Sequence, residues 1–241
     1  MTEAKVNNRL FRDSFVNRFR QFGFWHGTHQ LARAMIRHIY NCKENIVFII
    51  PDFRGYCFID TCIKPFTAER IQEAGAQKIL NEDQVNLFLS FISEGSKGLL
   101  AEVGGKLAAY GWVQFKGEYR FGKTGRMIIP TNCAIPKNLY VFPEYRGHNL
   151  GQKLNEARLH LIPPNFTPIA FIIPENRYAI RNWEKYGFRR VLYLKRWCWF
   201  NIRWRMIVTR LADGPQIQEI ERALIQGHKG KPPAMSHKVL P

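Results

Sequence analysis

The stretch that decides the fold is Leu139-Tyr-Val-Phe-Pro-Glu-Tyr-Arg146-Gly-His-Asn-Leu-Gly151. An apolar, strand-like run passes through a turn with Pro143 and Gly147 and continues into an amphipathic helix predicted over residues 147–161. A helix start has free backbone N–H groups and partial positive charge, which bind phosphate oxygens. Arg146 adds a fixed cation. The stretch therefore indicates a phosphate-bearing ligand such as a nucleotide; the simpler alternative is an ordinary strand–turn–helix.

Strands and helices alternate on both sides of this stretch, which is typical of a mixed α/β domain. Before it we expect a strand at 56–63, helices at 67–75 and 81–95, a hairpin of 98–103 and 106–115 around Gly104-Gly105, and a strand at 132–142. After it we expect a buried strand at 168–173, a helix at 177–186 ended by Gly187, and two strands within 188–211 that turn near Asn201.

Composition narrows the class of protein. The chain has 241 residues, of which 46% are hydrophobic, so one large domain or a domain with an appendage is expected and wholesale disorder is excluded. A net charge of +17 favours anionic partners, namely nucleic acid, phosphorylated cofactors or acidic lipid. The longest apolar runs, Ile46–Ile50 and Ile169–Ile173, are far shorter than the roughly 20 residues of a membrane span. The N-terminus has no apolar stretch typical of a secretory signal.

The five cysteines show no spacing typical of a metal site. We expect reduced thiols packed in or near a core, no bound metal, and a cytoplasmic protein.

The N-terminal segment predicts two short amphipathic helices. Their apolar positions are Phe11, Phe15, Phe19 and Phe22, then Leu31, Met35, Ile36 and Ile39, with arginines beside them. Such helices either dock on the main domain or bind an anionic membrane surface; nucleic acid is the least favoured partner. A second basic region, residues 177–210, holds ten basic residues and one acidic residue. Its tryptophans alternate with cations, as in a hairpin with one buried face or in a surface for a membrane-interface or sugar-phosphate acceptor.

Two motifs resemble those of the GNAT superfamily of N-acetyltransferases. Arg146-Gly-His-Asn149-Leu-Gly151 is similar to the acetyl-CoA signature, with Asn149 where a glycine is usual, and Asn tolerates positive φ. The second motif, Asn176 to Phe188, follows the buried strand in the family's order. The resemblance implies a GNAT-like α/β fold with a central mixed, mostly antiparallel sheet, splayed at the acetyl-CoA site and flanked by helices, with an N-terminal helical extension.

The resemblance also implies binding roles for acetyl-CoA, the donor substrate. The pantetheine arm would pair with the strand residues Leu139, Tyr140 and Val141, and Asn176 would hydrogen-bond its end. The diphosphate would lie on Arg146, Gly147, His148, Asn149, Leu150, Gly151 and Gln152.

Catalysis by direct amine attack needs a base, and an acid can assist the leaving thiolate. Trp183 stands where the family often has a tyrosine acid, so we expect it to wall the thioester from water. Tyr186 is the alternative acid, and Glu102 is a candidate base among the strand carboxylates. An oxyanion donor is expected near Val141.

These expectations give three segments: a basic helical extension (1–50), the acetyltransferase domain (51–211), and a C-terminal helix with a loose tail (212–241). The expected function is acetyl transfer to a small-molecule amine, in the cytoplasm or peripherally on the inner face of the membrane. A weaker likeness to acetyltransferases of bacterial surface-polysaccharide synthesis suggests an amino sugar or envelope precursor. A longer-chain N-acyltransferase and a non-catalytic protein that binds CoA or an anionic surface are the alternatives.

Overall fold

The computed structural model describes residues 40–58, 60–122, 125–200 and 203–228. The chain divides into two compact units, and each is described by itself. The smaller unit comprises residues 1–43 and 196–205; its described parts are ends of strands. The larger unit, residues 44–195 and 206–241, contains the features discussed below. The two amphipathic helices expected before residue 40 lie outside the described residues.

Within the described residues, eight strands form one sheet in the order β10-β9-β1-β8-β7-β4-β3-β2. Their bounds are β1 Tyr40–Ile49, β2 Ile63–Pro65, β3 Lys97–Val103, β4 Lys106–Gln114, β7 Cys133–Val141, β8 Thr167–Ile172, β9 Arg189–Trp199 and β10 Arg203–Arg210. A separate hairpin is made by β5, Glu118–Phe121, and β6, Gly125–Ile128. Strand β8 pairs with β1 in antiparallel register and with β7 in parallel register, so the sheet is mixed.

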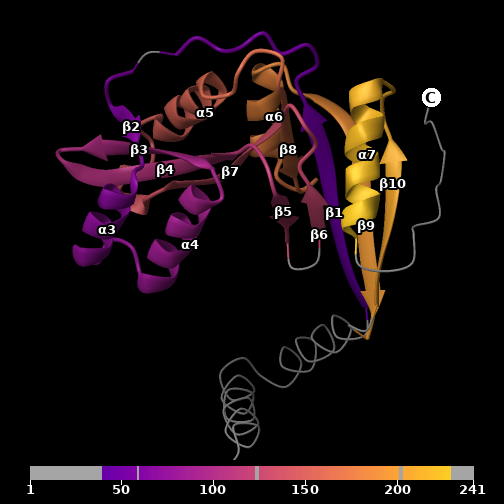
Figure 1. Cartoon of the computed structure of the whole chain (residues 1–241), viewed down its shortest axis with the longest axis horizontal. Coiled ribbons are helices and arrows are strands. Elements are labelled where there is room, and N and C mark those ends of the chain that lie inside the picture. The colour runs from indigo at the N-terminus through magenta and orange to yellow at the C-terminus, as the bar shows by residue number, and fades with distance from the viewer. Residues whose placement is uncertain (1–39, 59, 123–124, 201–202, 229–241) are drawn as a thin grey trace, which may run out of the picture. The chain divides into compact units, whose positions relative to one another are not determined.

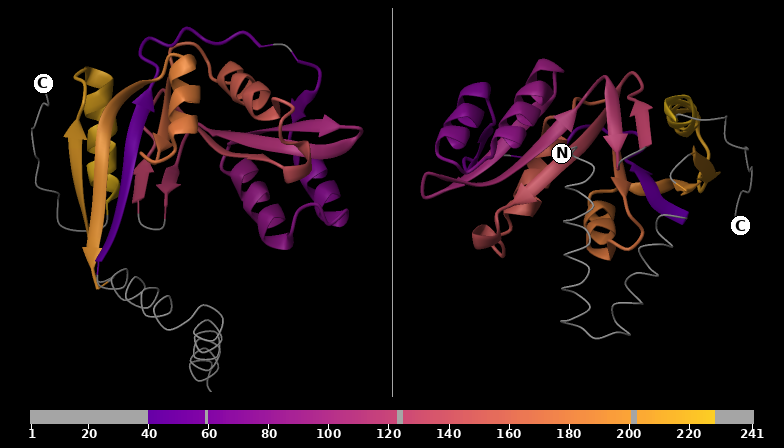
Figure 2. Two further views of the ribbon diagram at one scale, coloured as in Figure 1. Left: turned by 180° about the vertical axis from the view of Figure 1, so that it is seen from behind. Right: turned by 90° about the horizontal axis from the view of Figure 1, so that it is seen from below.

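Helices cover both faces of the sheet. They are α3 Ala68–Ala76, α4 Glu82–Ser93, α5 Leu150–His160, α6 Arg177–Lys185 and α7 Pro215–Gly227. Figure 1 shows α3 and α4 on one side of β2, β3 and β4, with α5 on the other side. The rear view in Figure 2 gives the same arrangement. The sheet therefore separates the face carrying α5 from the face carrying α4.

A local sequence signal accounts for the start of α4. Asn81 accepts a hydrogen bond from the Gln84 backbone, and the Gln84 side chain accepts one from the Asn81 backbone, which forms a capping box for α4. Packing then fixes both helices on the sheet, because Ile71 of α3 and Phe88 of α4 are buried together with Trp112 of β4. These elements confirm the helices expected at 67–75 and 81–95.

The mixed α/β, mostly antiparallel fold is confirmed, with three differences in detail. The strand expected at 56–63 is wrong, because regular pairing starts only at Ile63 and continues to Pro65. Strand β1 lies in the sheet beside β8, so the sheet begins before residue 51. The β5–β6 hairpin was not expected, since its four-residue strands are too short to show a period.

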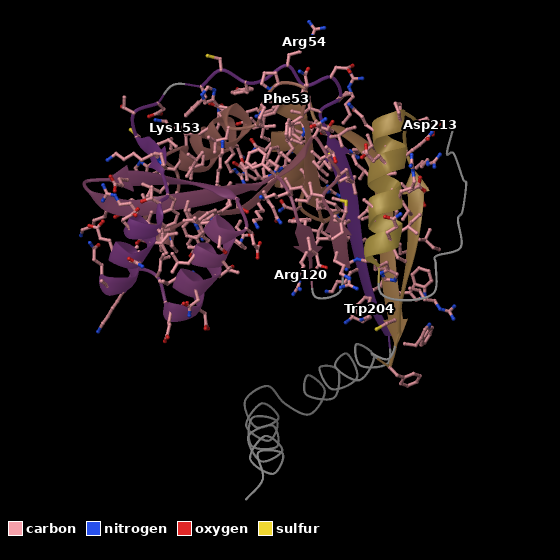
Figure 3. The ribbon with its side chains drawn as sticks, viewed as in Figure 1. Phe53, Arg54, Arg120, Lys153, Trp204 and Asp213 are labelled. Carbon is pink, nitrogen blue, oxygen red and sulfur yellow. The ribbon has the colours of Figure 1, made fainter. Side chains whose placement is uncertain are left out.

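The segment before β2 is fixed to α5 by charge. Lys153 on α5 forms an ion pair of 2.9 Å with Asp60, and this hydrogen bond lowers the pKa of the Asp60 carboxyl below its usual range. Figure 3 labels Lys153, which lies on α5. Cys57 and Cys62 in the same segment are exposed, whereas Cys133 and Cys198 are buried; the five cysteines are free thiols. The expectation of thiols packed in or near a core therefore holds for Cys133 and Cys198 but not for Cys57 and Cys62.

Candidate functional site

The turn between β7 and α5 presents a row of backbone donors. Gly147 has φ +88° and Asn149 has φ 57°, so two left-handed residues turn the chain before the helix. Within the part of the chain that the structure describes, the N–H groups from Gly147 to Gln152 donate to no acceptor. A row of unpaired donors at a helix start is suited to phosphate oxygens.

The space above these donors is open. A side chain at Gly147 would meet nothing within 4 Å, whereas a Cβ at Gly151 would lie 3.6 Å from Val141 Cγ2. Arg146 is exposed, and its Nε donates to the Val141 carbonyl at 3.3 Å, so its guanidinium lies at the junction of strand and turn. His148 is exposed on the same turn. A bulky anion can therefore approach the backbone closely, beside one fixed cation.

Strand β7 is not paired with β8 along the residues that lead into this turn. Their parallel register contains Cys133 with Thr167 and Ala134 with Pro168, and it ends there although β7 continues to Val141. The later residues Leu139 and Tyr140 are 37% and 39% exposed, which is high for apolar side chains in a central strand. The open edge of β7 can accept an extended ligand arm by backbone pairing.

A bulge interrupts β7 beyond the point where its pairing with β8 ends. Trp112 of β4 pairs with Lys137 and Tyr110 pairs with Tyr140, so two residues of β7 oppose one residue of β4. Asn138 in this bulge has φ 50°. Bulges redirect backbone groups and are common beside active sites.

Arg158 of α5 fills the α5 side of the bulge. It is 2% exposed, and one of its terminal nitrogens donates to the Lys137 carbonyl at 3.1 Å, while the other donates to the Asn155 side chain. A Cβ at Gly111 would lie 3.0 Å from Arg158 Cδ, so a glycine in β4 permits this packing. Burial lowers the pKa of Arg158 to about 9. The arrangement places a desolvated cation directly behind the bulge.

Trp183 and Tyr186 of the α6 region lie beside this cation. Trp183 is buried, and its ring centroid lies 5.6 Å from the Arg158 guanidinium carbon. The Tyr186 hydroxyl lies 3.4 Å from Glu156 Oε1. Burial first, and the Glu156 charge second, raise the pKa of Tyr186 above its usual value. Tyr186 therefore holds its proton tightly, which makes it a weak acid at neutral pH.

The expected site residues Asn176 and Glu102 lie in different surroundings. Asn176 caps α6, with its Oδ1 accepting from the Ala179 backbone at 3.0 Å, which leaves its amide nitrogen for a ligand. Glu102 lies on β3 and pairs with Lys64 at 2.6 Å and Arg70 at 3.5 Å. The Lys64 hydrogen bond lowers the pKa of Glu102, so it is a poor proton acceptor, and its partners lie toward the β2 edge of the sheet. The geometry gives Glu102 no place in the site.

A cleft of about 640 Å³ lies on the α4 face of the same bulge. Its lining includes Phe91 and Glu94 from the α4 region, Gln114 at the end of β4, Tyr119 and Arg120 from β5, and Lys137 from β7. Figure 3 labels Arg120 on the β5–β6 hairpin, at this cleft. Small-molecule sites commonly have such volumes and mix aromatic with polar lining residues.

Lys137 is the residue of this cleft that the sequence analysis missed. It is 8% exposed, its Nζ donates to Gln114 Oε1 at 2.8 Å, and the same nitrogen lies 3.5 Å from the Phe91 ring centroid. Burial lowers the pKa of Lys137 to about 8, partly offset by the Glu94 charge. The available signal was a single charged residue inside the mostly apolar strand Cys133 to Val141.

The acetyltransferase (GNAT) family model matches residues 64–188, which is more than half of the chain. The chain belongs to the GNAT acetyltransferase family. The matched range of this GNAT protein contains both motifs, the bulge and the cleft. No curated protein sequence matches the chain.

One solved structure agrees with the fold of this GNAT protein. A GNAT-family protein from Novosphingobium aromaticivorans is 20% identical with a TM-score of 0.50, and the match covers 64% of this chain and 63% of that one. This chain therefore spans less than two thirds of the length of that structure. A ribosomal-protein-alanine N-acetyltransferase from Brucella melitensis is 18% identical with a TM-score of 0.40, and the match covers 53% of this chain and 83% of that one.

Two further properties of the described residues bear on ligands. They contain no cluster of His, Cys, Asp and Glu side chains that could hold a metal ion. Among the helices described, none has the length and apolar character needed to cross a membrane.

Proposed function

We propose that this GNAT protein transfers an acetyl group from acetyl-CoA to the amine of a small-molecule acceptor. The observation that carries the proposal is the row of unpaired N–H groups from Gly147 to Gln152, adjoining the open edge of β7. A CoA diphosphate needs such donors, and its pantetheine arm needs a free strand edge. Family membership adds the expected donor substrate.

Each part of the site has its own role in this proposal. The turn from Arg146 to Gln152 binds the diphosphate, and residues 139–141 with Asn176 orient the arm so that the thioester lies near the bulge. A backbone N–H of β7 near Val141 donates to the developing oxyanion. The acceptor nitrogen forms a bond to the acetyl carbon, the carbon–sulfur bond breaks, and CoA leaves as a thiolate. Trp183 excludes water from that side.

The leaving thiolate needs no strong acid in this arrangement. A thiol pKa near ~8.5 makes the thiolate a tolerable leaving group. The buried cation of Arg158, with no carboxylate ion-paired to it among the described residues, adds positive potential behind the bulge. This potential favours negative charge on oxygen and sulfur as they develop it.

Two variants of the turn test donor binding by calorimetry with CoA. Arg146→Ala should weaken binding about tenfold, the size expected for losing one charged hydrogen-bonding group. Gly151→Trp should abolish binding, because an indole over Val141 blocks the approach. Arg54→Ala, an exposed arginine in the segment after β1, is the matched control and should bind normally. Unchanged affinity in both turn variants rejects the site.

Activity is measured as CoA thiol release with acetyl-CoA and a panel of amines. The panel includes amino sugars, amino acids and polyamines, and a longer acyl-CoA is run beside acetyl-CoA. Release of thiol that depends on both acceptor and enzyme supports acetyl transfer. CoA binding without turnover of any amine favours the non-catalytic alternative, for which the replacement of the usual tyrosine by Trp183 is the motive.

A further inference from the structure

The cleft on the α4 face meets the open edge of β7 at the bulge, and Lys137 lies at that meeting point. Its peptide carbonyl is held by Arg158 on the α5 side, while its side chain contacts Gln114 and Phe91 in the cleft. A group in the cleft therefore approaches the bulge from the face opposite to α5. Lys137 is the buried amine on that route.

The hydrogen bonds of the Gln114 side chain determine which of its atoms faces Lys137. Its Nε2 donates to the Lys116 carbonyl at 3.0 Å and to the Glu118 carbonyl at 3.1 Å, which uses both of its hydrogens. The amide oxygen must then point to Lys137 Nζ, from which it accepts one hydrogen bond. A neutral Lys137 amine satisfies this bond and retains a lone pair, so its environment accommodates the uncharged form.

The carboxylates that line the cleft, Glu94 and Glu118, are less suited than Lys137 to accept a proton. Glu118 is ion-paired to Arg120 at 2.7 Å and to Arg126 at 3.4 Å. Glu94 is exposed at the end of α4, where water solvates its charge. Tyr119 also lines the cleft, but burial raises its pKa to about 12, so it keeps its proton. Lys137 is the buried amine directed into the cleft.

We propose that Lys137 is the general base that takes the proton of the acceptor amine. This role rests on the proposed function. The acceptor nitrogen bonds to the acetyl carbon and gives one proton to neutral Lys137. The carbon–sulfur bond breaks, and CoA leaves as thiolate. One ammonium and one thiolate form together, so the charge balances. The lysine returns its proton to solvent through the cleft.

The pH dependence follows from the surroundings of Lys137. The charged and titratable groups around it are Glu94 from the α4 region, Lys116, Glu118, Tyr119 and Arg120 from the β4–β5 turn and β5, and Arg158 from α5. Burial lowers the pKa of Lys137 to about 8 and Glu94 opposes this in part. A base with this pKa is about one tenth neutral at pH 7, and its neutral fraction rises steeply up to pH 8.

The first test measures Lys137 itself, without turnover. Trace acetic anhydride labels neutral amines, and mass spectrometry gives the labelled fraction of each lysine against pH. Lys137 should be labelled with a midpoint near pH 8, and exposed Lys106 serves as the control for access of the reagent. An unlabelled Lys137, or one whose labelling midpoint lies near the ordinary lysine value, overturns the proposal.

The second test uses the acceptor found in the thiol-release assay. Lys137→Arg keeps the charge but cannot act as a base at neutral pH, so kcat should fall at least about 10²-fold with KM changed little, and the inflection near pH 8 should vanish. Lys106→Met should behave as the wild type. If Lys137→Arg retains kcat while Lys137→Met raises KM, the lysine anchors an anionic acceptor and the base role is wrong.

Calorimetry with CoA separates the two proposals. Normal CoA affinity in Lys137→Arg, together with the lost kcat, supports the base. Normal affinity with full activity overturns the base and leaves the proposed function intact. No CoA binding by the wild-type protein overturns the proposed function and the base role with it.

Discussion

Replacing Lys137 by Met should stabilise the protein at neutral pH and not at alkaline pH. Burial lowers the pKa of Lys137 from its ordinary 10.5 to about 8. Below pH 8 both folded and unfolded chains bind the proton, and the folded state carries the full cost of the buried charge. Between pH 8 and 10.5 the unfolded chain binds more protons, so the free energy of unfolding of the wild type rises with pH. Methionine has no such dependence.

The magnitude follows from the pKa and from one hydrogen bond. At about 1.36 kcal/mol per pKa unit, the buried charge costs about 3 kcal/mol at pH 7. Methionine removes this cost but leaves the Gln114 amide oxygen without its donor, which costs about 1 kcal/mol. The variant should therefore be about 2 kcal/mol more stable than the wild type at pH 7. At pH 10 the advantage should be lost.

Urea denaturation of both proteins at pH 6.5, 8 and 9.5 measures the effect. The difference in the free energy of unfolding should fall steadily as pH rises. Lys106→Met, at an exposed lysine, should stay within about 0.5 kcal/mol of the wild type at every pH. A difference that does not change with pH, or a Met variant that is the less stable at pH 7, would refute the reasoning.

Three further results are expected. Trp183→Phe should retain most transfer activity because an aromatic wall remains, whereas Trp183→Ala should lose more; a loss of about 10² in turnover for Tyr186→Phe would instead identify that hydroxyl as the acid. Gly227→Ala should lower the free energy of unfolding by about 2 kcal/mol or more, because its Cβ would overlap the Arg126 carbonyl of β6, and a denaturation midpoint equal to that of the wild type would contradict this close packing. Removal of residues 1–45 should reduce co-sedimentation with anionic liposomes, and added salt should weaken it; equal, negligible sedimentation of both forms would leave the segment only a docking role.

The turn between β7 and α5, which is proposed to bind the donor, could be predicted from sequence because its parts are consecutive. Arg146, Gly147, Asn149 and Gly151 lie within one turn and a helix start, so local conformation alone brings their backbone groups together. The positive φ of Asn149 followed from its tolerance of that region. The helix over 81–95 was predictable for the same reason, from an adjacent cap and a regular apolar period.

Catalytic candidates could not be ranked in this way. Glu102 is a plausible base by residue type, but strand pairing places it beside Lys64 and Arg70, which lowers its pKa. Tyr186 is a plausible acid by motif position, but burial and Glu156 raise its pKa. Proton affinity depends on neighbours supplied by other elements, and those neighbours are set by the fold.

The amino-acid sequence by itself determined the family, the helices over 67–75 and 81–95 and the strand–turn–helix that is proposed to bind the donor, since each depends on residues close together in the chain. Only the tertiary structure decided that β1 enters the sheet beside β8, that β7 separates from β8 after Ala134, and that Arg158 and Lys137 meet at one bulge from opposite faces. The physical reason is burial: desolvation changes the chemistry of these two cations, and it arises from contacts among α4, β4, β7, α5 and α6 that no local pattern specifies.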